Sequence, residues 1–524
     1  MMKGWSFFSQ AIFKKRGSLC NDLVLCCTRN TPCATKKVNV MDLYRLFHPE
    51  SIAVIGASPN LGGGKLPYYQ MLQLSGYKGR LYPVNPKYAE IGGVKVYRCL
   101  DDLPEAVDFA IACVPANKAL ETMEDAARCG VKFLHFFTSG FSEIGNFTLE
   151  KALLNAARKG GTRIVGPNCI GIHCSKSNVT CDVPKTPITG IGNVAFLGQS
   201  GGMTHNFMRM AHSRSLALNK VVSFGNQIDL AFEDYLDYFA DDDTIKVIAA
   251  YVEDIKNGPR FIEALKKTTR KKPLVILKAG ITEQGAKAAS SHTGAIAGSS
   301  EIWASMVKQF RCIEATNFEN MVDLTMMAVA DKVPGGPRVG FLGAGGGTSV
   351  LFTDIASLCG LTLPELSETT QRLIGEQLST VNTSTTNPVD LGYHGFDFAF
   401  MARTIETMAA DENIDAIIPY FSLDFITSFR RNQIETGPHI IVEAAQKIHK
   451  PVIPILSRFT ENILDVEDVR IKMFTIFRKA GLAVYNTPQD AVASIHGYLA
   501  WRYYRSQGKD AAGSVTQQLH AEAR

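Results

Sequence analysis

Features that would point to a membrane, a metal or a nucleic acid are missing from this sequence. No run of about 18 apolar residues occurs, so the sequence offers no obvious membrane span. The 12 cysteines are scattered without a Cys-x-x-Cys pair, which favours reduced core thiols over disulfides or a metal site. The 55 basic and 50 acidic residues leave a net charge of only +5 without basic blocks, so nothing favours nucleic-acid binding.

Acidic residues are nearly absent from the first 40 positions, where several lysines and arginines accompany the single acid Asp22. Such a leader, residues 1–40, is typical of an organellar presequence. It would also result from upstream sequence ahead of a true start at Met41. We therefore expect a cytoplasmic protein or, if the leader is real, one of a mitochondrial or related organelle matrix.

The rest of the chain predicts an α/β fold. A length of 524 residues with 46% hydrophobic residues is enough for about three globular domains. Short β-branched runs alternate with longer helical stretches, as in parallel sheets covered by helices. Breaks rich in proline, threonine and glycine separate the units. The predicted domains are residues 41–182, 190–332 and 336–504, followed by a polar tail at 505–524.

The first unit has a doubly wound, nucleotide-binding pattern. The later two units open alike, with a strand, a glycine-rich turn and a helix, which indicates an internal repeat. The expected strands of the first unit are residues 80–84, 109–114, 131–137 and 163–165, after an opening at 51–58. Residues 246–252 and 273–278 follow the second opening at 192–202, and the third opening is 338–347.

Three of these strands end in small residues and turn into a helix, which points backbone N–H groups at the carboxyl edge of a sheet and suits phosphate. The first turn, Gly56-Ala57-Ser58, lacks the Gly-x-Gly-x-x-Gly spacing of a dinucleotide site and could also be a tight turn without a ligand. The third, residues 343–348, could serve close packing alone.

The second turn contains Gln199, Ser200, Gly201 and Gly202, and two interpretations remain open. Its helix start could bind phosphate. It also fits Gly-x-Ser-x-Gly, the nucleophile turn of serine hydrolases, which would need an acid and a histidine further along the chain.

The segment from Lys278 to Gly298 is crowded with glycine and alanine, which allow a backbone to approach another surface closely. Its candidate nucleophile near neutral pH is His292. A phosphorylated histidine needs an acceptor for its other ring nitrogen, and Glu253, after a neighbouring predicted strand, offers a carboxylate at the same sheet edge. Alternatively, His292 is a structural loop histidine and Glu253 a surface or capping acid. Four other histidines are interpreted as structural: His135, His205, His212 and His394.

Eight segments carry the motifs of one family in order and spacing: residues 47–58, 81–87, 114–115, 138–143, 164–171, 199–202, 222–226 and 288–295. Over residues 42 to about 500, the sequence resembles the NDP-forming acyl-CoA synthetases, which include ADP-forming acetate–CoA ligase and are related to succinyl-CoA synthetase. The resemblance implies a CoA-binding Rossmann-like domain followed by two flavodoxin-like domains of the succinyl-CoA-ligase type.

The resemblance also implies a reversible reaction through a phosphohistidine. Phosphate attacks an acyl-CoA thioester to give an acyl phosphate and free CoA, His292 takes the phosphoryl group, and phospho-His292 passes it to ADP. Glu253 matches the family's glutamate that steadies the phosphohistidine, and residues 199–202 match the helix start that receives phosphate. The implied CoA contacts are Gly56, Ala57, Ser58, Asn85, Lys87, Val114 and Pro115, with Ser139, Gly140 and Asn168 nearer the thiol.

The nucleotide site of this family belongs to an ATP-grasp module, for which the residues after about 500 leave no room. The resemblance therefore implies a partner, an ATP-grasp β subunit that binds ADP or ATP with Mg²⁺, in a hetero-oligomer that acts on a small carboxylic acid and its CoA thioester. The identity of the acid, the direction of flux and the choice of ADP or GDP do not follow from these residues. Residues 379–386 depart from the family pattern. The alternative function is a non-catalytic CoA-binding regulatory protein on the same scaffold.

Overall fold

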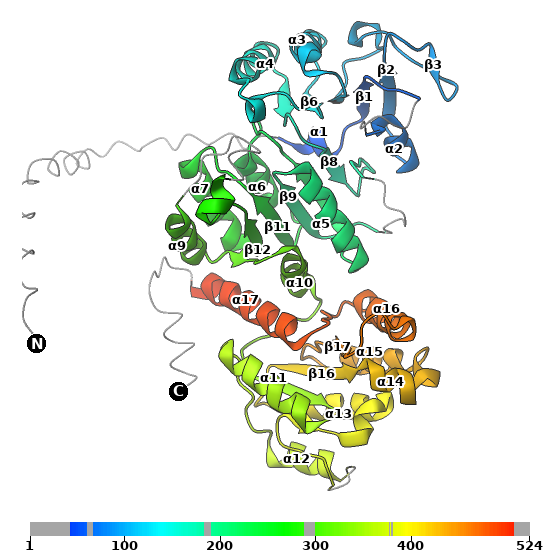
Figure 1. Ribbon diagram of the computed structural model, residues 1–524, viewed down its shortest axis with the longest axis vertical. Coiled ribbons are helices and arrows are strands. Elements are labelled where there is room, and N and C mark those ends of the chain that lie inside the picture. The colour runs from blue at the N-terminus through cyan, green and yellow to red at the C-terminus, as the bar shows by residue number, and fades with distance from the viewer. Residues whose placement is uncertain are drawn as a thin grey trace, which may run out of the picture. The chain divides into compact units, whose positions relative to one another are not determined.

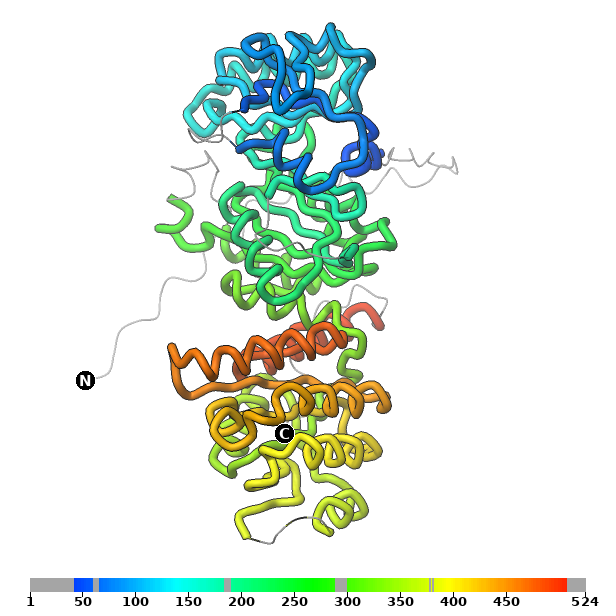
Figure 2. Tube along the Cα trace, turned by 90° about the vertical axis from the view of Figure 1, so that its right-hand side faces the viewer, coloured from blue at the N-terminus to red at the C-terminus, as the bar shows by residue number. Residues whose placement is uncertain are grey.

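The computed structural model describes residues 42–59, 66–182, 190–287, 299–376, 378 and 381–507. As predicted, these residues form an α/β fold, in which three mainly parallel sheets follow one another along the chain with helices packed on them (Figure 1). Each sheet comes mostly from one continuous stretch of chain, and the blue-to-cyan, green and yellow-to-red segments form separate groups in Figure 2. No helix among the described residues is long and apolar enough to cross a membrane.

The first sheet has five parallel strands in the order β2-β1-β5-β6-β7. They are β1 (Ser51–Ile55), β2 (Arg80–Val84), β5 (Phe109–Ala112), β6 (Phe133–Phe136) and β7 (Arg163–Val165), at the positions expected from the sequence. The unit also contains α1 (Tyr44–Phe47), α2 (Tyr68–Leu74), α3 (Ala119–Arg128), α4 (Phe147–Gly160), β3 (Glu90–Ile91) and β4 (Val94–Lys95). After β1 the chain goes to one side for β2 and returns to the other side for β5. Such a reversal opens a crevice at the carboxyl ends of β1 and β5.

The second sheet has six strands in the order β13-β12-β11-β9-β10-β8, all parallel except β8. They are β8 (Gly171–Cys174), β9 (Val194–Gly198), β10 (Leu218–Ser223), β11 (Val247–Val252), β12 (Leu274–Lys278) and β13 (Ile313–Glu314). The helices are α5 (Gly201–Ser213), α6 (Phe232–Asp241), α7 (Gly258–Lys271), α9 (Ser300–Phe310) and α10 (Phe318–Val329). Here the strand order reverses between β9 and β11, so a second crevice lies at their carboxyl ends.

The third sheet has four parallel strands in the order β15-β14-β16-β17. They are β14 (Val339–Gly343), β15 (Val389–Asp390), β16 (Ala416–Ser422) and β17 (Ile455–Ser457). Its helices are α11 (Gly346–Leu358), α12 (Glu368–Gly375), α13 (Phe398–Ala409), α14 (Leu423–Phe429), α15 (Gly437–Lys447), α16 (Leu464–Lys479) and α17 (Pro488–Gln507). As in the second unit, a glycine-rich turn joins the opening strand β14 to a helix.

Two elements connect the second sheet to its neighbours in sequence. β8 lies in the segment predicted for the first domain, residues 41–182, but it pairs with β10 of the second sheet. α17 follows the third sheet, and its Trp501 donates a hydrogen bond from Nε1 to the carbonyl of Thr269 on α7, at 2.9 Å. The second unit is therefore hydrogen-bonded to segments from both sides of the chain.

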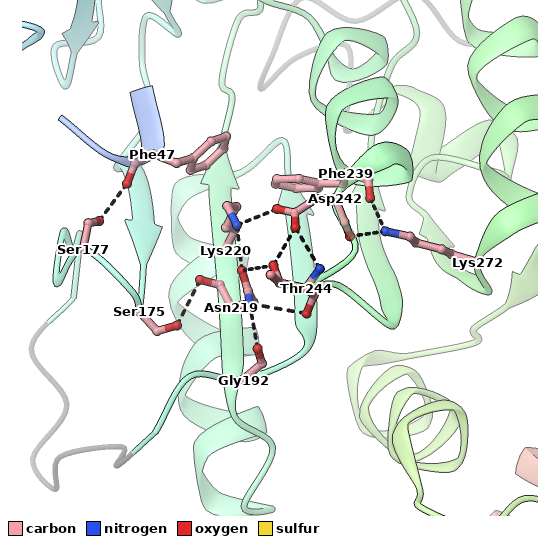
Figure 3. A network of polar contacts seen from close by, with 10 residues as sticks. All are labelled: Phe47, Ser175, Ser177, Gly192, Asn219, Lys220, Phe239, Asp242, Thr244 and Lys272. Atoms are coloured by element: carbon pink, nitrogen blue, oxygen red, sulfur yellow. Dashed lines mark hydrogen bonds and ion pairs between the residues drawn. The ribbon is translucent and has the colours of Figure 1, made fainter. Parts of the chain in front are cut away.

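A buried polar network lies near the amino ends of the strands of the second sheet, at the opposite edge from the crevice between β9 and β11 (Figure 3). Lys220 of β10, which is 3% exposed, donates to Asp242 Oδ2 at 2.6 Å and to Asn219 Oδ1 at 2.8 Å. Thr244 donates to Asp242 Oδ1 at 2.6 Å, and Asn219 Nδ2 donates to the Gly192 carbonyl at 2.7 Å. The charges of Lys220 and Asp242 balance each other, and the network lies away from the carboxyl edge of the sheet. We therefore infer that the network stabilises the fold and takes no part in the site.

Replacing Lys220 with methionine is expected to destabilise the protein by about 3–5 kcal/mol, because Asp242 is left without its ammonium partner. Burial alone would raise the pKa of Asp242, but the bonds from Lys220 and Thr244 lower it below 3.8. The stabilisation is therefore present at neutral pH and is lost as the pH falls below about 4. Chemical denaturation followed by circular dichroism measures the effect. The control Lys271→Gln, which breaks an exposed pair with Asp241, should change stability by no more than about 0.5 kcal/mol, and equal effects would contradict the assignment.

Candidate active site

A cavity of about 630 Å³ lies at the carboxyl edges of the first two sheets. Both crevices contribute residues to it, the first from the segments after β5 and β6 and the second from those after β9 and β11. Nine of the predicted site residues line it: Val114, Pro115, Ser139, Asn168, Gln199, Ser200, Gly201, Gly202 and Glu253. Residues predicted to bind phosphate and residues predicted to bind CoA thus line one cavity.

Helix α5 begins inside this cavity. Ser200 is its N-cap residue, and the Ser200 hydroxyl accepts a hydrogen bond from the backbone N–H of Met203 at 3.4 Å. A Cβ at Gly201 would come within 2.9 Å of Ile170 Cγ2, so the helix start packs closely against the chain leaving the first domain. The first N–H groups of a helix have no acceptor within it and favour an anion. The geometry therefore suits phosphate.

The conformation of Ser200 argues against the serine hydrolase interpretation. The nucleophile of a hydrolase lies on a strained turn, whereas Ser200 has an ordinary extended backbone with φ −89° and ψ 131°. Its hydroxyl caps α5, and no histidine ring is recorded as its hydrogen-bond partner within the described part of the chain. The Gly-x-Ser-x-Gly pattern here reflects a helix cap.

The side chain of Gln199 connects the start of α5 to the loop after β11. Its Oε1 accepts from the backbone N–H of Glu253 at 2.8 Å and from that of Asp254 at 2.9 Å. Its own backbone N–H donates to the Tyr251 carbonyl at 3.1 Å. Because Gln199 is only 7% exposed, these bonds are protected from water and fix Glu253 relative to the helix start.

The carboxylate of Glu253 has an unused acceptor. Among the described residues, no donor is recorded for its Oε2, which is buried. Burial, followed by the charge of Glu253, raises the pKa of Tyr251 above its ordinary value. Lys278, at the end of β12, donates to the Glu253 carbonyl at 2.8 Å, and burial lowers the pKa of its ammonium. The site therefore offers a buried carboxylate oxygen, on a residue whose backbone is held, to a further donor.

His292 lies outside the described residues. The described chain runs past the carboxyl end of β12 to Lys287 and resumes at Ser299. β12 is paired with β11 so that Lys278 is opposite Val252, the residue before Glu253. The segment that carries His292 therefore starts from the strand next to Glu253, at the same sheet edge.

The remaining predicted CoA residues do not line the cavity, but most of them surround the carboxyl ends of β1 and β2. Asn85 Nδ2 donates to the Ala57 carbonyl at 2.7 Å, and Asn85 Oδ1 accepts from the Lys87 backbone N–H at 3.0 Å. Gly56 has φ +85°, and a Cβ there would lie 2.6 Å from the carbonyl oxygen of Cys113. Only glycine fits that close approach. The backbone turn at residues 56–58 is therefore compact and lies at the first crevice.

Two residues without a predicted role connect the halves of the cavity. Asn226 donates from Nδ2 to Glu143 Oε2 at 2.7 Å and to Glu150 Oε1 at 2.8 Å, and it accepts from Asn168 Nδ2 at 3.3 Å. Glu143 Oε1 accepts from the backbone N–H groups of Gly140 and Phe141. Asn226 and Glu143 both belong to segments that the sequence marks as motifs, but no local pattern connects residues more than 80 positions apart.

The comparisons with known proteins agree with this architecture. Residues 50–175 match the CoA binding domain family, and residues 191–328 match the succinyl-CoA ligase like flavodoxin domain family. The α subunit of ADP-forming acetate–CoA ligase II from Pyrococcus furiosus is 34% identical over 474 residues, 90% of this chain and 98% of that protein. The ADP-forming acetate–CoA ligase of Methanocaldococcus jannaschii is 35% identical over 351 residues, and the match spans 67% of this chain and about half, 49%, of that protein.

A solved structure is also similar. It is the acetyl-coenzyme A synthetase 1 of Candidatus Korarchaeum cryptofilum, described as dinucleotide forming, in complex with phosphate and ADP. It aligns with a TM-score of 0.77 and 31% identity, covering 89% of this chain and 98% of that one. The fold and the two family matches therefore define a protein with a CoA-binding domain and a domain of the succinyl-CoA-ligase type. Within that class, the chain belongs to the family of ADP-forming acetate–CoA ligase α subunits.

Proposed function

We propose that this chain is the CoA-binding, phosphohistidine-carrying subunit of an ADP-forming acid–CoA ligase, which reversibly converts acyl-CoA, phosphate and ADP into acid, CoA and ATP. A phosphate oxygen attacks the thioester carbonyl, the C–S bond breaks, and CoA leaves as the thiol after taking up a proton. A ring nitrogen of His292 then attacks the phosphorus of the acyl phosphate, and the P–O bond to the acyl group breaks to release the carboxylate. Transfer to an oxygen of ADP breaks the P–N bond and restores His292.

The observation that carries the proposal is an anion site and an unused carboxylate oxygen in one cavity. The start of α5 at Gly201 suits phosphate, and Glu253 Oε2 has no recorded donor among the described residues. A histidine that attacks phosphorus through one nitrogen carries its proton on the other, and an acceptor for that proton fixes the tautomer and ring orientation. Glu253 is suited to be this acceptor for His292.

The CoA thioester would place its reactive end at the residues shared by the cavity and the first sheet. We assign Val114, Pro115, Ser139 and Asn168 to the thiol end because they line the cavity that contains the start of α5. We assign the turn at residues 56–58, with Asn85 and Lys87, to the nucleotide end because it forms the first crevice. Gly140, whose N–H is bound by Glu143, supports the thiol end.

Replacing Glu143 with glutamine is expected to raise the KM for acyl-CoA about tenfold, because a charge-assisted bond to the Gly140–Phe141 backbone is lost and an amide faces the Asn226 donor. Burial would raise the pKa of Glu143, but its hydrogen bonds lower it below 4.5. The contribution is therefore present at neutral pH and is lost as the pH falls below about 4.5. Steady-state kinetics measure the change. Glu121→Gln, which breaks an exposed pair on α3, is the control, and an unchanged KM in Glu143→Gln would remove Glu143 from the site.

For the nucleotide step we propose a partner, an ATP-grasp β subunit that holds ADP or ATP with Mg²⁺. The name of the Pyrococcus relative, an α subunit, supports a separate partner chain. The Methanocaldococcus ligase, of which the match spans about half, is consistent with the same activity carried on one longer chain. We propose small carboxylic acids as the substrate class.

A labelling experiment separates the ligase from the alternative of a non-catalytic CoA-binding protein. The full chain is incubated with acetyl-CoA and labelled phosphate, and free thiol and acid-labile protein-bound label are measured. The ligase should release up to one CoA per chain in a phosphate-dependent burst and acquire the label. Binding of acetyl-CoA, and of a panel of other acyl-CoA thioesters, without thiol release would support the regulatory alternative instead.

A further inference from the structure

The proposed reaction brings more negative charge into the cavity than the start of α5 can balance. Phosphate carries between about one and two negative charges at neutral pH, and Glu253 adds another beside it. A helix N-terminus supplies roughly half a positive charge. In a site partly shielded from water, such an imbalance weakens anion binding strongly. A cation at the cavity would offset this imbalance.

Lys256 is the only lysine or arginine among the described residues that line this cavity. It follows Glu253 by three positions, in the loop between β11 and α7. Its ammonium lies 3.0 Å from Asp254 Oδ2, and its side chain is 48% exposed. The Asp254 side chain is only 13% exposed, but that of Lys256 is half exposed and flexible, so the ammonium can turn from Asp254 toward another anion at the cavity.

The backbone of this loop is held at several points. Gln199 binds the N–H groups of Glu253 and Asp254, and Gln227 Nε2 donates to the Asp254 carbonyl at 3.3 Å. On the other side of Lys256, Asn257 caps α7 by accepting from the Arg260 N–H at 3.2 Å. Lys256 therefore has a flexible side chain on a fixed backbone, at the cavity that contains the start of α5.

We propose that Lys256 is a catalytic residue that neutralises phosphate and the acyl phosphate at the start of α5, and that its ion pair with Asp254 holds it ready when the anion is absent. This inference rests on the function proposed above. In the ligase reaction, the ammonium leaves Asp254 Oδ2 and contacts the phosphate oxygens, which offsets the charge of Glu253. Asp254 then competes with phosphate for the same cation, so its carboxylate weakens phosphate binding.

The test measures binding of labelled inorganic phosphate to the full chain by equilibrium dialysis, together with KM values in the thiol-release reaction. Lys256→Gln should raise the Kd and KM for phosphate about 10- to 30-fold and leave the KM for acyl-CoA within about twofold. Lys256→Arg keeps the charge and should stay within about threefold of wild type. Asp254→Asn removes the competitor and should tighten phosphate binding severalfold.

The matched control is Lys271→Gln. Lys271 also pairs with an aspartate, Asp241, but it ends α7, a helix of 14 residues and so about 20 Å long, whereas Lys256 precedes that helix. Phosphate binding by Lys271→Gln should equal that of wild type. If wild type binds phosphate and releases thiol while Lys256→Gln matches Lys271→Gln, Lys256 is only a surface ion-pair partner and the ligase assignment stands. If wild type neither binds phosphate nor releases thiol, the ligase assignment falls and Lys256 has no phosphate role.

Discussion

His292→Ala should abolish the acid-labile phosphoryl label and lower ligase turnover at least about 10⁴-fold, the largest effect expected of any single change in this chain. The physical reason is that the phosphoryl group is carried on a covalent bond to the imidazole, and alanine has no nucleophile that could form this bond. Acyl phosphate can still form at the start of α5, but its phosphoryl group has no route to a nucleotide. The measurement is incorporation of labelled phosphate from acetyl-CoA and phosphate, followed by discharge to ADP on addition of the β subunit.

The control for this change is His439→Ala, which removes an exposed histidine on α15 of the third unit. It should label as wild type does. Because acyl-CoA and phosphate binding do not need the imidazole, His292→Ala should retain both. Full labelling of His292→Ala would contradict the assignment of this residue as the carrier.

Glu253→Gln should slow phosphorylation about 10²-fold. The amide keeps the shape of the side chain and the backbone bonds to Gln199, but it removes the negative charge that pairs with the histidine N–H and steadies the phosphorylated ring. The effect should fall on the rate of label incorporation and on the lifetime of the label, with the KM for acyl-CoA unchanged.

A carboxylate of the same type on the same unit provides the control. Glu263 is exposed on α7, and Glu263→Gln should label at a rate within about twofold of wild type. If Glu253→Gln labels as fast as Glu263→Gln, the unused Oε2 of Glu253 has a purely structural role.

The sequence predicts which candidate residues share a sheet edge better than it predicts the contacts that hold them there. Strand patterns locate Gln199 and Glu253 after β9 and β11, and in parallel sheets such residues meet at one edge. The same patterns leave Ser200 open to a hydrolase interpretation, because a Gly-x-Ser-x-Gly match contains no backbone angles. The extended conformation of Ser200 and its bond to the Met203 N–H argue against the hydrolase interpretation.

Contacts between distant segments account for most of what the sequence does not reveal. Asn226 binds Glu143 and Glu150, 83 and 76 positions away, and no periodic pattern encodes such a meeting. The pairing of β8 with β10 is equally non-local, so the predicted end of the first domain does not mark the edge of a sheet. In the sequence Lys256 is one of many lysines in predicted loops, and no motif marks it. Its position at the wall of the cavity is what distinguishes it from other lysines.

Mapping the phosphorylated residue tests the central claim most directly. The full chain is labelled with acetyl-CoA and phosphate, digested under alkaline conditions that preserve phosphoramidates, and analysed by mass spectrometry. We expect a single phosphohistidine in the peptide that contains Ser291, His292 and Thr293, lost on brief acid treatment and on addition of ADP with the β subunit. Phosphate on a serine or on another histidine, or an unmodified His292 after CoA has been released, would contradict the account.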